Sequence, residues 1–316
     1  MTITGRLKYK LKSWTARIKL TAKHIHLPFF KELTLYDILH FYTIGIVRGF
    51  LTMRASAIAY NFFMALFPFL LFVLSAIAFV PIEGFQENVI QFFHDVLPPK
   101  THELFDGIIY DIATHRRKSL LSAGILLSVL FMANGVNAML TGFESSVNKV
   151  LDYRKYYKKY AYALLISIIL ILILFITLAG IIYFEIYIIY NLKKHGVIHD
   201  ISPWVYWSKR IFYFFMTLIS VSVIYKFGTE EGKKLPFISP GSIFSSVFFL
   251  IGFYLYGLYI LNFNRYNQLY GSIGALLILQ FMIYVYAIIL LLGHELNMSI
   301  VKLKTKKAAK LNSIPD

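Results

Sequence analysis

The chain has 316 residues, of which 58% are hydrophobic, 17% are aromatic and only 15% are charged. This composition excludes a disordered chain, and it excludes an ordinary soluble domain, in which about 25% of the residues are charged. The absence of cysteine excludes disulfides and cysteine zinc sites, while the net charge of +16 is typical of basic loops beside anionic lipid.

The basic segment 1–54 predicts two amphipathic helices at the membrane surface. Apolar residues recur at helical spacing over 3–18 with lysines between them, which indicates a helix lying on an anionic leaflet; a loosely ordered basic tail is the alternative. A second apolar stripe follows Thr34 and Asp37, which have the spacing of a capping box. We expect this second helix to turn into the first span near Arg54.

Six stretches with few charged residues are long enough to cross a bilayer, because about 20 apolar residues span its hydrocarbon core. We place the spans at about 55–81, 119–142, 161–190, 204–226, 237–262 and 269–296. The fourth is the weakest and reaches full length only with an interfacial belt of tryptophan and tyrosine. The prediction is an all-α, polytopic integral membrane protein with a transmembrane domain over 55–300 and a basic tail over 301–316.

The longest hydrophilic insertion, 83–118, predicts an extracytoplasmic helical hairpin. Apolar residues at helical spacing occur on both sides of Pro98 and Pro99, which interrupt the run. Acidic residues outnumber basic ones in this insertion, which is consistent with translocation across the membrane.

Lysine and arginine counts give the orientation of the spans. With six spans, the two tails and the even-numbered loops share one side, and 23 of the 32 cationic residues lie there. Both termini are therefore expected in the cytoplasm, because short cytoplasmic loops are enriched in lysine and arginine. The basic run 116–118, on the expected outer side, is a signal in the opposite direction.

Polar residues inside the spans are candidate functional residues, because such groups avoid lipid and face the bundle interior. Asn134, Asn137 and Thr141 form a stripe along the second span, which indicates either close helix packing or a substrate-facing surface. Pro68 in the first span removes a backbone donor, and Asn61 or water in a cavity is expected to satisfy the freed carbonyl. A cavity-lining kink and a static bend both fit this pattern.

Two further candidates are charged. Glu185 lies toward the outer end of the third span and is either an interfacial carboxylate or a protonatable coupling site. Glu295 lies near the cytoplasmic end of the sixth span, at the predicted depth of Arg54. We expect a structural ion pair of Glu295 with Arg54, or with Arg48.

Enzyme signatures fail on their spacing. The segment 228–234 has three residues between its glycines where a phosphate loop has four, and it lacks the following serine or threonine. His294 and Glu295 start a zincin-like pattern that lacks its second histidine, and His24 and His26 have no acidic neighbours. We predict no catalytic residue, no metal and no cofactor.

Several motifs resemble those of the YihY/BrkB family of bacterial inner-membrane proteins. They are the stretch 55–71, Phe143-Glu144 through Asn148 with Arg154 following, Pro240-Gly241-Ser242, and the segments 270–275 and 293–297. Their order and spacing cover roughly residues 35–300. The family usually has alanine where this chain has His294. The resemblance implies six spanning helices with cytoplasmic termini in the bacterial inner membrane.

The resemblance does not imply a reaction. Members were once labelled ribonuclease BN, but that activity requires a His-x-His-x-Asp-His metal cluster that this chain lacks. Another label describes serum resistance, which is a phenotype, and roles in envelope lipid handling have been proposed for relatives.

Our leading hypothesis is a non-enzymatic transporter or flippase-like protein for a lipid, amphiphile or small solute in envelope maintenance. A structural or scaffolding membrane protein is the alternative, and a ribonuclease is disfavoured. The expected partners are anionic lipid headgroups at the cytoplasmic face, an unidentified substrate and, as an open alternative, further copies of the chain. No specific nucleic-acid partner is expected.

Overall fold

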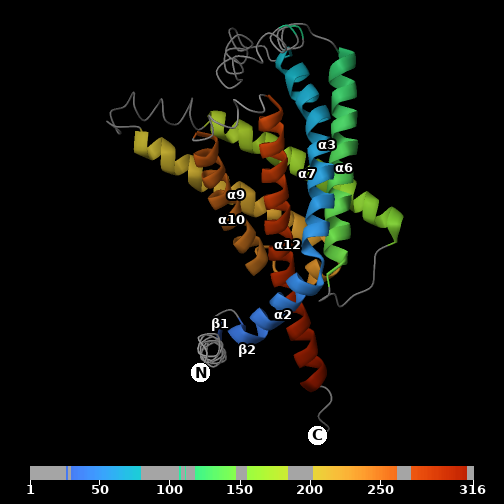
Figure 1. Ribbon diagram of the computed structural model, residues 1–316, viewed down its shortest axis with the longest axis vertical. Helices are drawn as coiled ribbons and strands as arrows, with labels where there is room; N and C mark the ends of the chain where they lie inside the picture. Colours follow the sequence, from blue (N-terminus) through green and yellow to red (C-terminus); the bar gives the residue numbers. More distant parts are fainter. Residues whose placement is uncertain are drawn as a thin grey trace, which may run out of the picture.

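The computed structural model describes residues 26–27, 30–79, 107, 111, 118–146, 155–183, 202–261 and 272–311. Its helices are α2 (Leu35–Arg48), α3 (Leu51–Ile77), α6 (Lys118–Glu144), α7 (Tyr156–Tyr183), α9 (Ser202–Gly228), α10 (Pro240–Leu261) and α12 (Ser272–Leu311). A short 3-10 helix, η2 (Glu231–Lys234), lies between α9 and α10. The predicted helical fold is confirmed (Figure 1).

A short antiparallel ladder precedes α2 and was not predicted. Strand β1 (His26–Leu27) pairs with β2 (Phe30–Thr34), with His26 opposite Thr34 and Leu27 opposite Phe30. The ladder leads directly into α2, which begins where the capping-box spacing of Thr34 and Asp37 predicts a helix start.

Six of the described helices are long and apolar enough to cross a membrane, which confirms the predicted number of spans. Several boundaries differ from the prediction by a few residues; α7, for example, begins at Tyr156 rather than 161. Helix α3 begins at Leu51 rather than 55, and α12 continues to Leu311, through most of the segment that we expected to be a tail. The extension is helical because Ile300 and Leu303 are buried against Phe41 of α2, and Val301 packs with Leu235 beside η2.

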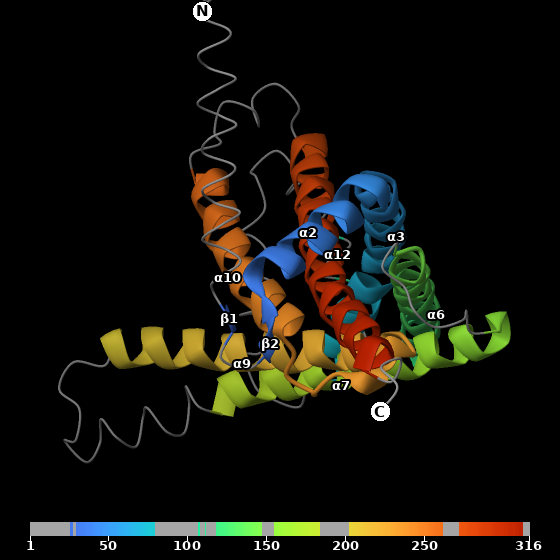
Figure 2. The same cartoon turned by 90° about the horizontal axis from the view of Figure 1, so that it is seen from below.

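The six spanning helices form a closed ring in chain order. Helix α3 packs on α6, α6 on α7, α7 on α9, α9 on α10, α10 on α12, and α12 returns to α3. Helices α7 and α9 lie side by side and run obliquely to α3, α6 and α12 (Figures 1 and 2). Helix α2 lies across one end of this ring, where it packs on α12 (Figure 2).

The interior and the outer surface of the ring are both largely apolar. Fully buried residues from several helices, including Val136, Met139, Ala163 and Leu291, form the main core. Large apolar side chains such as Phe253, which is 67% exposed, cover the outside. Such an outer surface is suited to contact with lipid hydrocarbon. An apolar interior together with an apolar outer surface explains why so many residues of the chain are hydrophobic.

Some predicted features lie outside the described residues. They are the amphipathic helix over 3–18, the helical hairpin over 83–118 apart from Gly107 and Asp111, and Glu185 at the outer end of the third span.

Candidate polar cluster and membrane cavity

A buried ion pair joins the first and last spanning helices. The Nη2 of Arg54 on α3 lies 2.8 Å from Oε1 of Glu295 on α12, and the two side chains are 7% and 0% exposed. Ser146, just beyond α6, donates a hydrogen bond of 2.8 Å to the other carboxylate oxygen of Glu295. Arg54 also donates through Nη1 to the carbonyl of Gly142, at 2.8 Å. These contacts neutralise the buried charges and connect α3, α6 and α12.

The turn between α2 and α3 allows the arginine to reach this position. A Cβ added at Gly49 would lie 2.9 Å from Nη2 of Arg54, and it would also collide with the carbonyl of Gly45. The next residue, Phe50, has a φ of 48°, in the left-handed region that side chains other than glycine rarely adopt. The sharp turn from α2 into α3 therefore depends on Gly49 and on a strained Phe50.

The segment Gly293–Asn297 of α12 lies among five neighbouring helices at this end of the ring. Glu295 reaches α3 and the end of α6, and Leu296 packs against the apolar pair Ile300 and Leu303, on which Phe41 of α2 also packs. The ring of His294 stacks on Phe143 of α6, with centroids 4.2 Å apart and planes 6° from parallel. Gly293 and Asn297 contact α9 and α10.

The contact with α10 is made at very short range. A Cβ at Gly293 would collide with the hydroxyl of Ser245, and it would lie 2.5 Å from the hydroxyl of Tyr225 on α9. Asn297 accepts a hydrogen bond of 2.9 Å from the backbone N–H of Gly241 and donates one of 2.9 Å to Ser239. Asn297 thus satisfies the buried amide of Gly241 at the N-terminal end of α10, which has no partner within its own helix.

An ion pair brings α7 into the same end of the ring. Lys159 near the start of α7 lies 3.2 Å from the carboxylate of Glu144, the last residue of α6. Both side chains are largely buried, at 13% and 7% exposure. Together with the contacts of 293–297 and the hydrogen bond of 2.7 Å from Tyr225 of α9 to the carbonyl of Leu290, this pair places polar connections to all six spanning helices at one end.

Tyr42 on α2, outside the spanning helices, lies close enough to interact electrostatically with the carboxylate of Glu295. Burial raises the pKa of its hydroxyl, and the negative charge of Glu295 raises it further, to about 12. The neutral phenol is therefore favoured beside the carboxylate.

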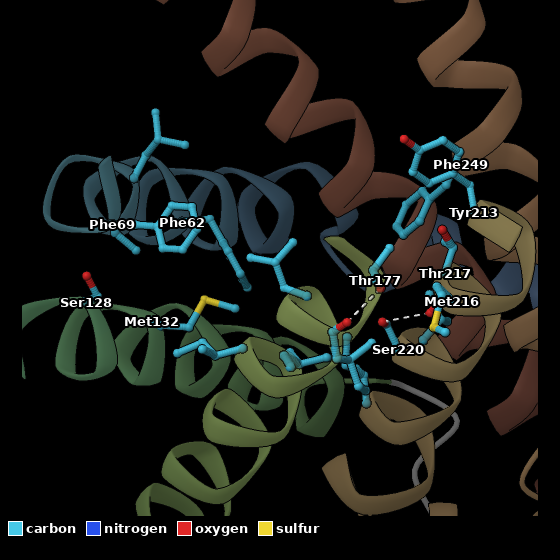
Figure 3. A pocket seen from close by; sticks show the side chains of 18 residues that line it. Phe62, Phe69, Ser128, Met132, Thr177, Tyr213, Met216, Thr217, Ser220 and Phe249 are labelled. Atoms are coloured by element: carbon cyan, nitrogen blue, oxygen red, sulfur yellow. Dashed lines mark hydrogen bonds between the residues drawn. The ribbon is translucent and has the colours of Figure 1, made fainter. Parts of the chain in front are cut away.

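Beyond this polar cluster lies an apolar cavity of about 440 Å³ (Figure 3). Its lining comes from α3, α6, α7, α9 and α10, so it lies between these five helices, and it is partly open, because Tyr213 in the lining is 43% exposed. In Figure 3, Phe62 and Phe69 of α3 and Met132 of α6 face side chains of α7 and α9 across the space. At 1.5 Å per residue, Phe62 lies roughly 12 Å along α3 from Arg54, which places the cavity toward the middle of the spans.

The polar residues expected to face a cavity do not line this one. Asn61 donates to the carbonyl of Ala57 in its own helix, and Thr141 donates to that of Asn137. Asn134 is exposed, and its amide oxygen accepts a bond of 3.3 Å from Tyr160 of α7. The Oδ1 of Asn137 is buried and has no hydrogen-bond partner among the described residues. Pro68 lies within α3, which continues through it without interruption.

The structure brings Arg54 and Glu295 together, as the similar depth of the two residues indicated. The sequence did not predict that the remaining members of the cluster form a site. The segments 293–297 and Pro240-Gly241-Ser242 were identified only as motifs of the family resemblance. The cavity lining was missed because it is built from phenylalanine, methionine and leucine, which also cover the lipid-facing surface. Hydropathy alone does not show which face of each helix turns toward the cavity and which toward the lipid.

Six apolar spanning helices closed into a ring define a polytopic helical membrane protein. The chain belongs to the virulence factor BrkB family, which it matches over residues 48–313, from the end of α2 through α12.

One curated relative is the ribonuclease-like protein YfkH of Bacillus subtilis (strain 168). The two chains are 26% identical over 251 residues, which cover 77% of this chain and 88% of YfkH. No solved structure matches the chain. Within the residues that the structure describes, no group of three histidine and acidic side chains is placed to hold a metal ion.

Proposed function

We propose that this protein is a non-enzymatic transport protein of the inner membrane that moves a lipid, an amphiphile or a small solute between the two sides of the bilayer. The observation that carries the proposal is the cavity of about 440 Å³ between α3, α6, α7, α9 and α10. This volume lies in the range of known small-molecule sites, about 300–1,000 Å³. A substrate site between helices at membrane depth is the arrangement that transport requires.

The ring offers a way to expose the cavity to one side at a time. Polar contacts and a packed core seal the end that contains Glu295, where the 293–297 segment connects the helices. Movement of α7 and α9 against α3 and α6 would open the cavity without separating that end. Both termini face the cytoplasm in this proposal, because 23 of the 32 cations lie on that side.

A ribonuclease function is disfavoured by the side-chain chemistry. Hydrolysis of a phosphodiester by a metal-dependent enzyme needs several histidine or carboxylate ligands around the ion, and Glu295 and Glu144 are instead engaged by Arg54 and Lys159. We therefore assign the excess of cations to anionic lipid headgroups at the cytoplasmic surface rather than to RNA.

The rival proposal is a structural or scaffolding membrane protein. It is favoured by the contact of Asn134 with Tyr160, which links two helices without lining the cavity. A scaffold tolerates a filled cavity, whereas a transporter does not, and this difference separates the two proposals.

The experiment is movement of labelled compounds by purified protein in vesicles. A panel of fluorescent phospholipids, single-chain amphiphiles and small solutes is followed in vesicles with and without the protein. The proposal expects at least one class to move faster with the protein present. Equal rates across the panel would favour the scaffold.

A further inference from the structure

We propose that the cavity between these five helices is a binding site for a single uncharged alkyl chain, with the polar headgroup of the ligand held outside it. This inference rests on the proposed function and names the class of substrate for the same site. It goes further in excluding ions and polar solutes from the cavity itself.

The chemistry of the lining carries the inference. None of the 18 described lining residues is charged, and most are aliphatic, aromatic or methionine side chains. A phosphate, a carboxylate or an ammonium group placed there would lose its hydration without gaining a counter-charge, which is strongly unfavourable. An alkyl chain carries no charge and loses no hydration of a charge on entering the cavity. Lipid alkyl chains also surround the spans and are therefore available as ligands.

The hydroxyl groups in the lining strengthen the argument. Ser128 donates to the carbonyl of Gly124, Thr177 to that of Ile173 and Ser220 to that of Met216, each four residues earlier in its own helix. The hydrogen atoms of these hydroxyls are thus already engaged by the backbone. These three hydroxyls provide no donor for an anionic ligand, and Tyr213 and Thr217, the other hydroxyl-bearing residues of the lining, bring no positive charge.

The length of the lining is compatible with part of an acyl chain. Phe62 and Phe69 of α3 both line the cavity and are seven positions apart, so the lining extends roughly 10 Å along this helix. That length accommodates about eight methylene groups of an extended chain. Met132 and Met216 line the cavity on α6 and α9, and methionine adapts readily to a flexible ligand.

Photolabelling tests the site directly. The full chain, purified in lipid nanodiscs, is irradiated with a phosphatidylcholine that carries a diazirine in the middle of one acyl chain. We expect labelled residues in the lining segments of α7 and α9, including the neighbourhood of Thr177 and Met216. Labelling confined to outward residues such as Phe253 would overturn the inference.

A matched pair of variants on α3 gives the control. Ala65 is buried in the lining, whereas Ala57 on the same helix is exposed. Ala65→Phe is expected to reduce labelling of α7 and α9 roughly tenfold, because the new phenyl group occupies the space of several methylene groups of the lipid chain. Ala57→Phe should leave the labelling unchanged. Equal labelling in both variants would contradict the proposal.

A second cavity variant and a transport readout keep the outcomes separate. Ser220→Leu fills the cavity from α9 and should reproduce the loss if Ala65→Phe is not monodisperse after purification. Labelling of the lining without lipid movement in vesicles would support the site and contradict the transport proposal. Movement of a polar solute that both cavity variants leave intact, with no lining label, would overturn the alkyl-chain site and leave transport standing.

Discussion

The guanidinium of Arg54 and the carboxylate of Glu295 meet at 2.8 Å although the two residues are 241 positions apart. The contact connects the first and last spanning helices and closes the ring at one end. Because both side chains are buried, removing either charge leaves the other without a counter-ion in a region of low dielectric.

Glu295→Gln is expected to lower the stability of the protein by about 3–5 kcal/mol, the usual cost of removing one partner from a buried ion pair. The measurement is thermal unfolding in detergent, with the loss of monodispersity on heating as the readout. A double-mutant cycle with Arg54→Gln should show coupling, while a cycle with Arg48→Gln should be additive. Additive effects of Glu295→Gln and Arg54→Gln would contradict a stabilising ion pair between the two residues.

Lys233→Gln, which removes a charge from an exposed pair, is the control for this variant. Glu230 pairs with Lys233 at 2.7 Å, but their side chains are 32% and 56% exposed. Exposed pairs contribute about 0–1 kcal/mol, so this change should leave the unfolding temperature almost unchanged.

Gly293→Ala is expected to destabilise the contact between α12 and α10. Its Cβ would collide with the hydroxyl of Ser245, and overpacking of this kind typically costs about 1–3 kcal/mol. Gly257→Ala on α10 is the matched control, because a Cβ there has no atom within 4 Å. Unfolding temperatures that fall equally for both variants would contradict the close approach at Gly293.

The hydroxyl of Tyr42 predicts a loss of stability at alkaline pH. Its pKa is raised to about 12 in the folded protein, compared with about 10 in the unfolded chain. The folded state therefore holds the proton more tightly, and stability is constant below about pH 10 and falls as the pH rises toward 12. Tyr42→Phe should lose less stability than the parent between about pH 10 and pH 12. Identical losses would show that Tyr42 does not experience the burial and charge described here.

The chain contains no cysteine, so single introduced cysteines report topology cleanly. Thr43 on α2 and Lys306 on α12 are exposed at the same end of the bundle, and Gly107 is exposed in the insertion between α3 and α6. Thr43→Cys and Lys306→Cys should react with a membrane-impermeant maleimide only after the cytoplasmic side is opened. Gly107→Cys should react in intact spheroplasts. Reaction of the first two on opposite sides would contradict an even number of spans.

The six spans were predictable because each is a long stretch with few charges, and hydrocarbon imposes that pattern on any spanning helix. The pairing of Arg54 with Glu295 was predictable for a related reason, since charges at one depth need partners. The helical extension of α12 was not, because the alternation of lysine with Val301 and Leu303 resembles a solvated tail until α2 and η2 are in place.

The cavity shows the opposite limit. Asn134 and Thr141 were candidates for either close helix packing or a substrate-facing surface because polar groups are conspicuous in a hydrophobic segment, and in the structure Thr141 bonds its own backbone and Asn134 contacts Tyr160. The lining residues, such as Phe62 and Met216, are conspicuous only once the rotation of every helix is known. A hydrophobic site in a hydrophobic protein carries almost no signal in composition or spacing.

The most direct test of the account compares lipid movement in vesicles that contain the parent protein, Ala65→Phe or Ala57→Phe. A chain-bearing lipid should cross the bilayer faster with the parent and with Ala57→Phe than in empty vesicles. Ala65→Phe, with the cavity filled, should return the rate to that of empty vesicles. Equal rates for the two variants would contradict the claim that the ring moves its substrate through this cavity.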